Sequence, residues 1–216
     1  MMGAKTLYKA YAAPGLVMRD DAGVLADVML DPVQVAVWDR HSPLDQQVVQ
    51  LACREKLAVK SWLDVADLPA SMMRSLPGED FAPLREDLAL LADMMACLFG
   101  ATGVGLRVTA LEKPMCPRFH VDQVPCRLIT TFAGPATQWL EENSLNRSKL
   151  GRGSNGQPDS SSGLIQANAN IQKITVGDVA LLKGERWEGN EGRGIVHRSP
   201  GVEQGQQRLL LTLDMA

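Results

Sequence analysis

The segment Arg118-Phe119-His120-Val121-Asp122 says most about the fold and its chemistry. In an extended strand, residues two positions apart point to the same side, so His120 and Asp122 can face a single point. An imidazole and a carboxylate placed in this way are two suitable ligands for a divalent metal ion. The same pattern also arises by chance, as a surface histidine beside a solvated aspartate. Further ligands have to decide between the two interpretations.

A third ligand must come from a short list, because the chain has only three histidines: His41, His120 and His197. A lone histidine near a strand end, such as His197, is more often structural than a ligand. Together with His120 and Asp122, however, it completes a set of two histidines and one carboxylate. This set leaves open positions on a non-haem Fe(II) ion for oxygen and a co-substrate. His41 lies beside an expected helix start, and we expect a structural role for it.

Arg208 begins the apolar segment that ends the chain. Leu209, Leu211 and Leu213 form one face of this expected strand, and Arg208 lies on the other face. A guanidinium that points into a closed interior needs an anionic partner, because an unpaired buried charge is very costly. A small dicarboxylate bound by the guanidinium fork would satisfy it, and so would a salt bridge to a neighbouring aspartate or glutamate. Both alternatives stay open at this point.

The second half of the chain has the pattern of a β-rich structure. Short segments suited to strands are separated by Gly, Pro, Asn and Asp signals, at residues 104–111, 126–132, 171–176, 179–182 and 209–213. Between them, residues 143–163 are polar and rich in Ser, Gly and Asn. This stretch predicts a long excursion from a compact sheet, either an active-site lid or a disordered loop.

The first half is expected to be mainly helical. Apolar residues recur at spacings of three and four over residues 80–99, and Gly100 supplies a stop. A second helix is expected over residues 44–56, a strand over 32–38, and an irregular, partly helical arm over 1–30. The sequence therefore predicts an α+β fold in one domain, 1–216. In it, a mainly helical portion, 1–103, packs on a β-rich portion, 104–216.

Taken together, these residues resemble the Fe(II)/2-oxoglutarate-dependent dioxygenase superfamily. Its pattern is His-x-Asp, a long gap, a distal histidine and a basic residue about ten positions later. Here 77 positions separate His120 from His197, and Arg208 follows 11 positions after His197. Residues 127–132 with 134–139 look like the strand and turn that follow His-x-Asp in prolyl-hydroxylase-like members. Residues 177–182 look like the strand that precedes the distal histidine.

The resemblance implies a double-stranded β-helix core, of jelly-roll or cupin-like type, with an N-terminal helical layer. It implies catalytic Fe(II) held by His120, Asp122 and His197, and 2-oxoglutarate bound by Arg208. Arg127, at the start of the strand after His-x-Asp, is a second expected cofactor-binding residue. The activity implied is hydroxylation of an unidentified substrate.

A closer resemblance leads to a bacterial family catalogued as a domain of unknown function. The segments that carry it are residues 116–122, 177–184 with 187–190, and 196–200. The same residues leave other functions open. Cys116 and Cys126 flank the His-x-Asp segment, and thiolates favour zinc, so zinc is the alternative metal. A non-catalytic metal-binding or metal-sensing protein on the same scaffold is the alternative to an oxygenase, and a catalytically silent structural domain is the third.

Composition excludes several other classes. Of the 216 residues, 45% are hydrophobic and 22% are charged, which is typical of a globular protein and not of a disordered one. A net charge of −3 provides no basic field for nucleic acid. No apolar stretch reaches the length of a bilayer span, the N-terminus lacks a signal-peptide pattern, and the four cysteines form no Cys-x-x-Cys pair. We therefore expect a cytoplasmic protein with a small-molecule or peptide substrate and no nucleic-acid or membrane partner. The oligomeric state stays open.

Overall fold

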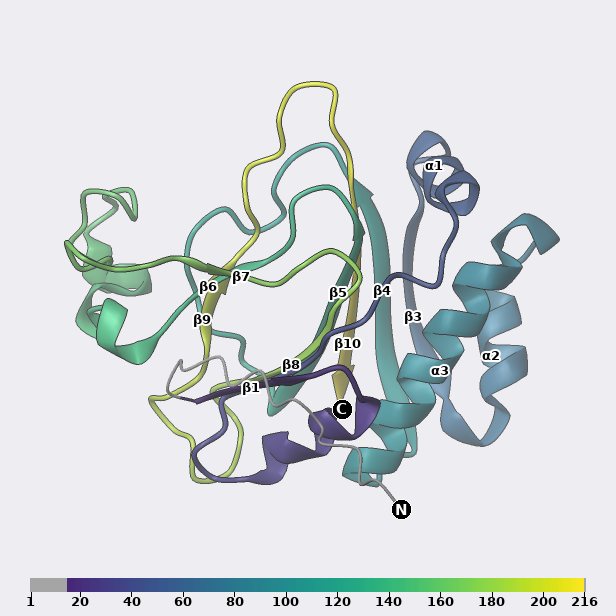
Figure 1. The fold of residues 1–216 in the computed structure, drawn as a ribbon, viewed down its shortest axis with the longest axis horizontal. Helices are drawn as coiled ribbons and strands as arrows, with labels where there is room; N and C mark the ends of the chain where they lie inside the picture. Colours follow the sequence, from purple (N-terminus) through teal and green to yellow (C-terminus); the bar gives the residue numbers. More distant parts are fainter. Residues whose placement is uncertain (1–14, 216) are drawn as a thin grey trace, which may run out of the picture.

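A computed structural model describes residues 15–215, and its strands form two sheets (Figure 1). The large sheet has seven strands in the order β1-β2-β8-β5-β10-β4-β3, and the small sheet has three in the order β7-β6-β9. The strands of the large sheet are β1 (Leu16–Arg19), β2 (Val35–Trp38), β3 (Ala58–Asp64), β4 (Gly103–Leu111), β5 (Cys126–Ala133), β8 (Val179–Lys183) and β10 (Arg208–Met215). Those of the small sheet are β6 (Gln138–Leu140), β7 (Gln172–Lys173) and β9 (Val196–Arg198).

The last strand, β10, lies at the centre of the large sheet, antiparallel to both β4 and β5. Successive side chains of β10 point to opposite faces of the large sheet and so enter different cores. Leu209, Leu211 and Leu213 are fully buried in the larger hydrophobic core, on the face covered by helices. Leu210 packs instead in the core between the two sheets, with Ile129 of β5 and Trp139 of β6. Arg208 therefore enters the space between the sheets, as its place in the alternation predicts.

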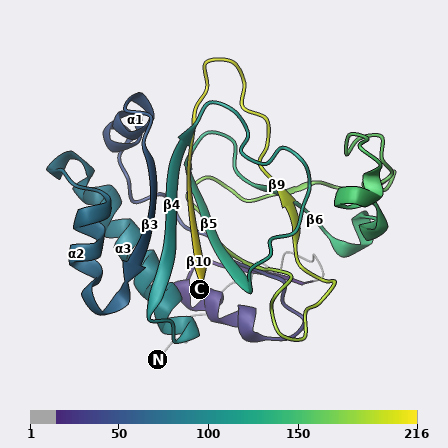
Figure 2. The same ribbon diagram turned by 180° about the vertical axis from the view of Figure 1, so that it is seen from behind.

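Three helices and a 3-10 segment cover the outer face of the large sheet, as Figures 1 and 2 show from opposite sides. They are α1 (Gln46–Arg54), α2 (Leu68–Ser75), α3 (Ala82–Phe99) and the 3-10 segment Ala22–Met29. The Asp45 side chain accepts a hydrogen bond from the backbone N–H of Val48 and so caps α1. Gly100, at φ 63°, ends α3 in the left-handed conformation that glycine adopts without strain. The α+β class is confirmed.

The N-terminal portion is less helical than the sequence indicates. Three strands of the large sheet, β1, β2 and β3, come from residues 15–103, and residues 58–64 were not expected to form a strand. In β3, Leu63 is buried in the helix-covered core, while Trp62 is exposed on the opposite face. The expected strand over residues 171–176 is reduced to two residues, and residues 1–14 of the expected N-terminal arm lie outside the described residues.

Residues 141–165 leave the small sheet on the side away from the helices, in green in Figure 1. They form three short 3-10 turns, Glu142–Ser144, Arg147–Lys149 and Gly151–Ser154. Leu145 and Leu164 are buried in a third apolar cluster with Leu140 of β6 and Val196 of β9. The excursion is therefore packed on the small sheet through a shared apolar core, which a freely moving lid would not have.

The helices described for residues 15–215 include none with the length and apolar character needed to cross a bilayer.

Candidate metal centre

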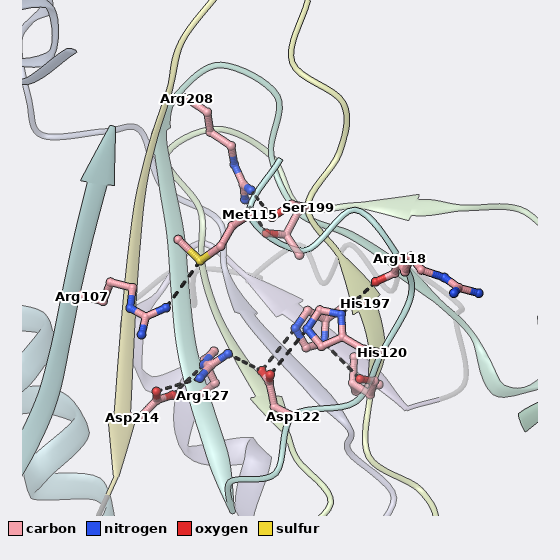
Figure 3. A network of polar contacts seen from close by, with 12 residues as sticks. Arg107, Met115, Arg118, His120, Asp122, Arg127, His197, Ser199, Arg208 and Asp214 are labelled. Carbon is pink, nitrogen blue, oxygen red and sulfur yellow. Dashed lines mark hydrogen bonds and ion pairs between the residues drawn. The ribbon is translucent and has the colours of Figure 1, made fainter. Parts of the chain in front are cut away.

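His120, Asp122 and His197 converge between the two sheets, as the sequence predicts for a metal site (Figure 3). One ligand atom from each residue can be chosen so that all three lie within 4.8 Å of one another. Nε2 of His197 is 3.2 Å from Oδ2 of Asp122, and Nε2 of His120 is 3.7 Å from Oδ1. These are the donor types and the number of protein ligands that a non-haem Fe(II) site uses.

The backbone joins the two histidines directly. His120 and His197 form an antiparallel β-bridge in which each backbone N–H donates to the other's carbonyl, at 3.0 and 2.9 Å. On its other side His197 pairs with Trp139 of β6. Ile195 packs in the core between the sheets and Val196 in the core of the excursion. This alternation turns His197, two residues after Ile195, toward the large sheet.

Both imidazoles are oriented by their second ring nitrogen. Nδ1 of His120 lies 2.9 Å from the carbonyl oxygen of Arg118, and Nδ1 of His197 lies 3.1 Å from that of Ile195. A carbonyl only accepts hydrogen bonds, so each Nδ1 donates and each Nε2 keeps its lone pair. Burial, and then the nearby His197, lowers the pKa of His120 below its ordinary value. The neutral, metal-binding form of His120 is thereby favoured.

Asp122 is held ionised by its neighbours. Burial would raise the pKa of Asp122, but the neighbouring His197, Arg127 and His120 lower it to about 2. Nη1 of Arg127 is 2.8 Å from Oδ2 of Asp122. The Nε and Nη2 atoms of Arg127 donate to the two carboxylate oxygens of Asp214 at 2.6 and 2.7 Å. Arg127 thus lies between two carboxylates.

This arrangement differs from the expectation that Arg127 binds a co-substrate. All three of its guanidinium nitrogens already face Asp122 or Asp214. Burial would lower the pKa of Arg127, but these two carboxylates raise it. Its contacts are those of a residue that orients Asp122. The sequence contained a signal for this arrangement, because Arg127 on β5 and Asp214 on β10 are direct cross-strand partners once the pairing of the two strands is known.

Arg208 lies wholly buried and has no carboxylate partner among residues 15–215. Its guanidinium donates to three hydroxyl oxygens, those of Ser199 at 3.0 Å, Thr137 at 2.7 Å and Thr131 at 3.3 Å. Its Nε has no hydrogen-bond partner. Burial lowers the pKa of Arg208 to about 10, so it remains a cation at neutral pH. Of the two alternatives left open by the sequence, the salt bridge within the chain is not formed in the described structure.

The cysteines lie apart from this centre. Cys126 is buried in the helix-covered core, on the opposite side of the large sheet from the histidines, and burial raises the pKa of its thiol. Cys116 is exposed. The cluster of potential ligands among residues 15–215 contains no cysteine. A zinc site built from Cys116 and Cys126 is therefore not what the structure forms, because alternation along β5 turns Cys126 away from the site.

Asp159, a residue the sequence did not single out, ties the excursion to both ligand segments. Its buried carboxylate accepts a hydrogen bond from the backbone N–H of Phe119 at 2.7 Å. Arg118 and Arg198 lie on either side of it, at 3.6 and 3.8 Å. The guanidinium of Arg198 also stacks over the ring of Phe119 at 4.3 Å. The sequence predicted either an active-site lid or a disordered loop over residues 143–163, and the structure shows this segment ordered and anchored through Asp159.

The comparisons with known proteins agree with this architecture. Residues 19–214 match a family model described as "Protein of unknown function (DUF1826)". The chain belongs to the DUF1826 family. This confirms the predicted resemblance to a bacterial family of unknown function. No curated protein matches this DUF1826 chain.

Several solved structures resemble the DUF1826 chain at low sequence identity. A protein from Shewanella oneidensis described as a "Putative oxygenase" has a TM-score of 0.50 and 12% identity, and the match covers 93% of this chain and 89% of that one. A Pseudomonas putida prolyl-4-hydroxylase has a TM-score of 0.45 and 13% identity, with 89% and 96% covered. The rice dioxygenase for auxin oxidation has a TM-score of 0.46 and 13% identity; the match covers 79% of the DUF1826 chain and only 65% of that protein's length. At 12% identity, the match to the Shewanella oneidensis protein shows a shared fold and nothing of its activity.

Proposed function

We propose that this DUF1826 protein is a non-haem Fe(II)/2-oxoglutarate-dependent oxygenase that hydroxylates an as yet unidentified substrate. His120, Asp122 and His197 would hold Fe(II), and Arg208 would bind the carboxylate of 2-oxoglutarate that lies farther from the metal. The observation that carries the proposal is the buried Arg208 cation, which has no anion of its own among the described residues and begins the strand beside the metal centre. An unpaired buried charge is costly, and an incoming carboxylate removes that cost.

Two further observations support the proposal. The large and small sheets face each other across a shared apolar core, as the two sheets of the proposed double-stranded β-helix, or jelly roll, would. The three hydroxyls around Arg208 can rotate to donate to a carboxylate while the guanidinium remains in place. A dicarboxylate would then be held by one fixed cation and adjustable hydroxyl groups.

The residues of the chain fit the metal as well. Each Nδ1 to carbonyl hydrogen bond directs the opposite nitrogen of its ring toward the centre. Arg127 keeps Asp122 ionised and oriented through the contact of its Nη1 with Oδ2, and each carboxylate oxygen lies within 3.7 Å of the Nε2 atom of a histidine. Bound Fe(II) together with 2-oxoglutarate would supply the oxidising chemistry for insertion of oxygen into a C–H bond. The protein contributes binding, orientation and exclusion of water.

Zinc is also bound by two histidines and one carboxylate, so a non-catalytic metal-binding or metal-sensing role is the second candidate. It shares the three ligands with the oxygenase but gives Arg208 no partner. Turnover of 2-oxoglutarate separates the two.

The test is anaerobic reconstitution with Fe(II), then exposure to oxygen while conversion of 2-oxoglutarate to succinate is followed. We expect turnover in the wild type. We expect Arg208→Met to weaken 2-oxoglutarate binding roughly ten- to a hundredfold with metal affinity retained, because charged hydrogen bonds contribute about 1.5–3 kcal/mol. Substitution of His197 by alanine should remove the metal, and Arg152→Gln, an exposed arginine in the excursion, is the control. If the wild-type protein binds Fe(II) but not 2-oxoglutarate, the oxygenase proposal is overturned and the non-catalytic metal-binding role is favoured.

A further inference from the structure

The inner face of the large sheet carries a row of residues that runs from the metal centre to an exposed tryptophan. Trp62 of β3 pairs with Gly105 of β4, Gly105 pairs with Asp214 of β10, and Asp214 pairs with Arg127 of β5. Cross-strand partners point to the same face, so the row ends at Arg127, which contacts Asp122. Three strand spacings of about 4.8 Å separate β3 from β5, so Trp62 lies roughly 14 Å from Arg127.

Trp62 forms a flat apolar surface at the end of this row. Its side chain is 54% exposed, and its ring lies over Gly103, where a Cβ atom would come within 2.1 Å of it. Gly105 adds no side chain between Trp62 and Asp214, so the row is open at that point. A single exposed tryptophan is ordinary on a protein surface. Because the Trp62 ring lies flat over Gly103, in the row that leads to Arg127, it offers an exposed face on which a flat ligand can stack.

The neighbouring row is positively charged. Lys60 of β3 and Arg107 of β4 are direct cross-strand partners, and like charges in this position destabilise a sheet. Neither forms an ion pair with another residue in the described range 15–215. Arg107 contacts only a weak acceptor, with Nη1 3.5 Å from the sulfur of Met115. Figure 3 shows Arg107 on the same side of the sheet as Arg127 and Asp122.

We propose that Lys60, Trp62 and Arg107, here called the Trp62 surface, bind the substrate of this protein, a small anionic molecule with a flat aromatic or unsaturated part. The anionic group would lie between Lys60 and Arg107 and relieve their repulsion, while the flat part stacks on Trp62. The rest of the molecule would extend over Gly105 toward the Asp214–Arg127 pair, which borders Asp122. Identification of the ligand as the substrate rests on the proposed oxygenase function, whereas binding to the Trp62 surface requires neither metal nor 2-oxoglutarate.

The test uses 2-naphthoate as probe and 2-naphthamide as its neutral counterpart, with binding measured by titration calorimetry on metal-free protein. We expect naphthoate to bind more tightly than naphthamide to the wild type, and Arg107→Gln to weaken naphthoate about tenfold without changing naphthamide. Trp62→Ala should weaken both probes, and Trp62→Phe should retain most of the affinity. Arg152→Gln, which removes an exposed arginine elsewhere, should change neither.

The outcome is independent of the oxygenase proposal. An excess of 2-oxoglutarate should not displace naphthoate, because its expected partner is Arg208. Absence of naphthoate binding, displacement by 2-oxoglutarate, or binding that is unchanged in both Arg107→Gln and Trp62→Ala would overturn the Trp62 surface, whatever the protein does with 2-oxoglutarate. Naphthoate binding that follows the expected pattern in a protein that does not convert 2-oxoglutarate would leave the surface established and overturn the oxygenase.

Discussion

Substitution of Gly184 by alanine should disturb the candidate metal centre although Gly184 is not one of its three residues. Gly184 follows β8 directly, and its N–H donates to the carbonyl of Pro125 at 2.8 Å. A Cβ atom at Gly184 would lie 2.0 Å from the carbonyl oxygen of Val124 and 3.0 Å from that of Asp122. Both obstacles are backbone atoms, so a side-chain rotation cannot make room. The segment that carries Asp122 has to move.

The size of the effect follows from this overlap. Overpacking of a well-packed site costs about 1–3 kcal/mol of unfolding free energy. For a chain of this length, a loss of about 2 kcal/mol lowers the midpoint of thermal unfolding by roughly 4–8 °C. Moving Asp122 away from His120 and His197 disturbs ligand atoms that now lie within 4.8 Å of one another. Loss of ligand positioning typically lowers metal affinity about 10–100-fold.

Thermal unfolding of the metal-free protein and calorimetric titration with Zn(II) measure the two effects separately. Gly201→Ala is the matched control, because Gly201 has no heavy atom within 4 Å of its Cβ position and does not require the left-handed backbone conformation. It should match the wild type in both measurements. If Gly184→Ala bound Zn(II) with wild-type affinity, even at a lowered unfolding temperature, the contact would not position Asp122 and the reasoning would be refuted.

Three further predictions concern other contacts. Asp159→Asn should lower Zn(II) affinity several-fold in titration calorimetry, because it removes the charge that ties the excursion to both ligand segments, whereas Asp80→Asn, at an exposed site, should not. Breaking the buried pair of Arg40 and Asp87, joined at 2.6 and 2.8 Å, by Asp87→Ala should cost about 3–5 kcal/mol in denaturant unfolding. The double variant Arg40→Met with Asp87→Leu should recover most of that loss of unfolding free energy. An equal loss in Asp87→Ala and in the double variant would contradict this prediction. In the metal-free protein, Asp122 has a pKa of about 2 against an ordinary 3.8. The ionised Asp122 therefore contributes about 2 kcal/mol to the unfolding free energy above pH 4, and this contribution is lost as the pH falls toward 2. An Asp122→Asn variant whose unfolding free energy falls by the same amount over that range would refute this.

The convergence of His120, Asp122 and His197 followed from the sequence better than the scaffold around them did, and their role as metal ligands stays a prediction. His120 and Asp122 are two apart in one extended segment, so their common face follows from local geometry alone. Helix α3 follows equally from its apolar spacing. The strand β3 was missed because its apolar residues alternate with an exposed lysine and an exposed tryptophan, and its pairing with β4 is a long-range contact.

The contacts of Arg127 and Asp159 could not be predicted from the sequence for a related reason. Arg127 meets Asp214 across 87 positions, and Asp159 meets Phe119 across 40. Neither partner is marked by local spacing, because both depend on strand register and on the course of the excursion. Strands of three residues, such as β6 and β9, are defined by their partners more than by their own sequence.

The β-bridge between His120 and His197 has a consequence for the entropy of metal binding. An ion that had to draw together two ligands 77 positions apart in a flexible chain would meet a loop-closure cost of about 4 kcal/mol in addition to a constant term. Reciprocal backbone hydrogen bonds already hold the two residues in register without any ion. Folding has thus met that cost in advance for the two histidines, so an ion held by His120, Asp122 and His197 would not have to draw them together. Metal should therefore exchange without unfolding, and chelation should leave a folded protein that takes up a second ion as readily as the first.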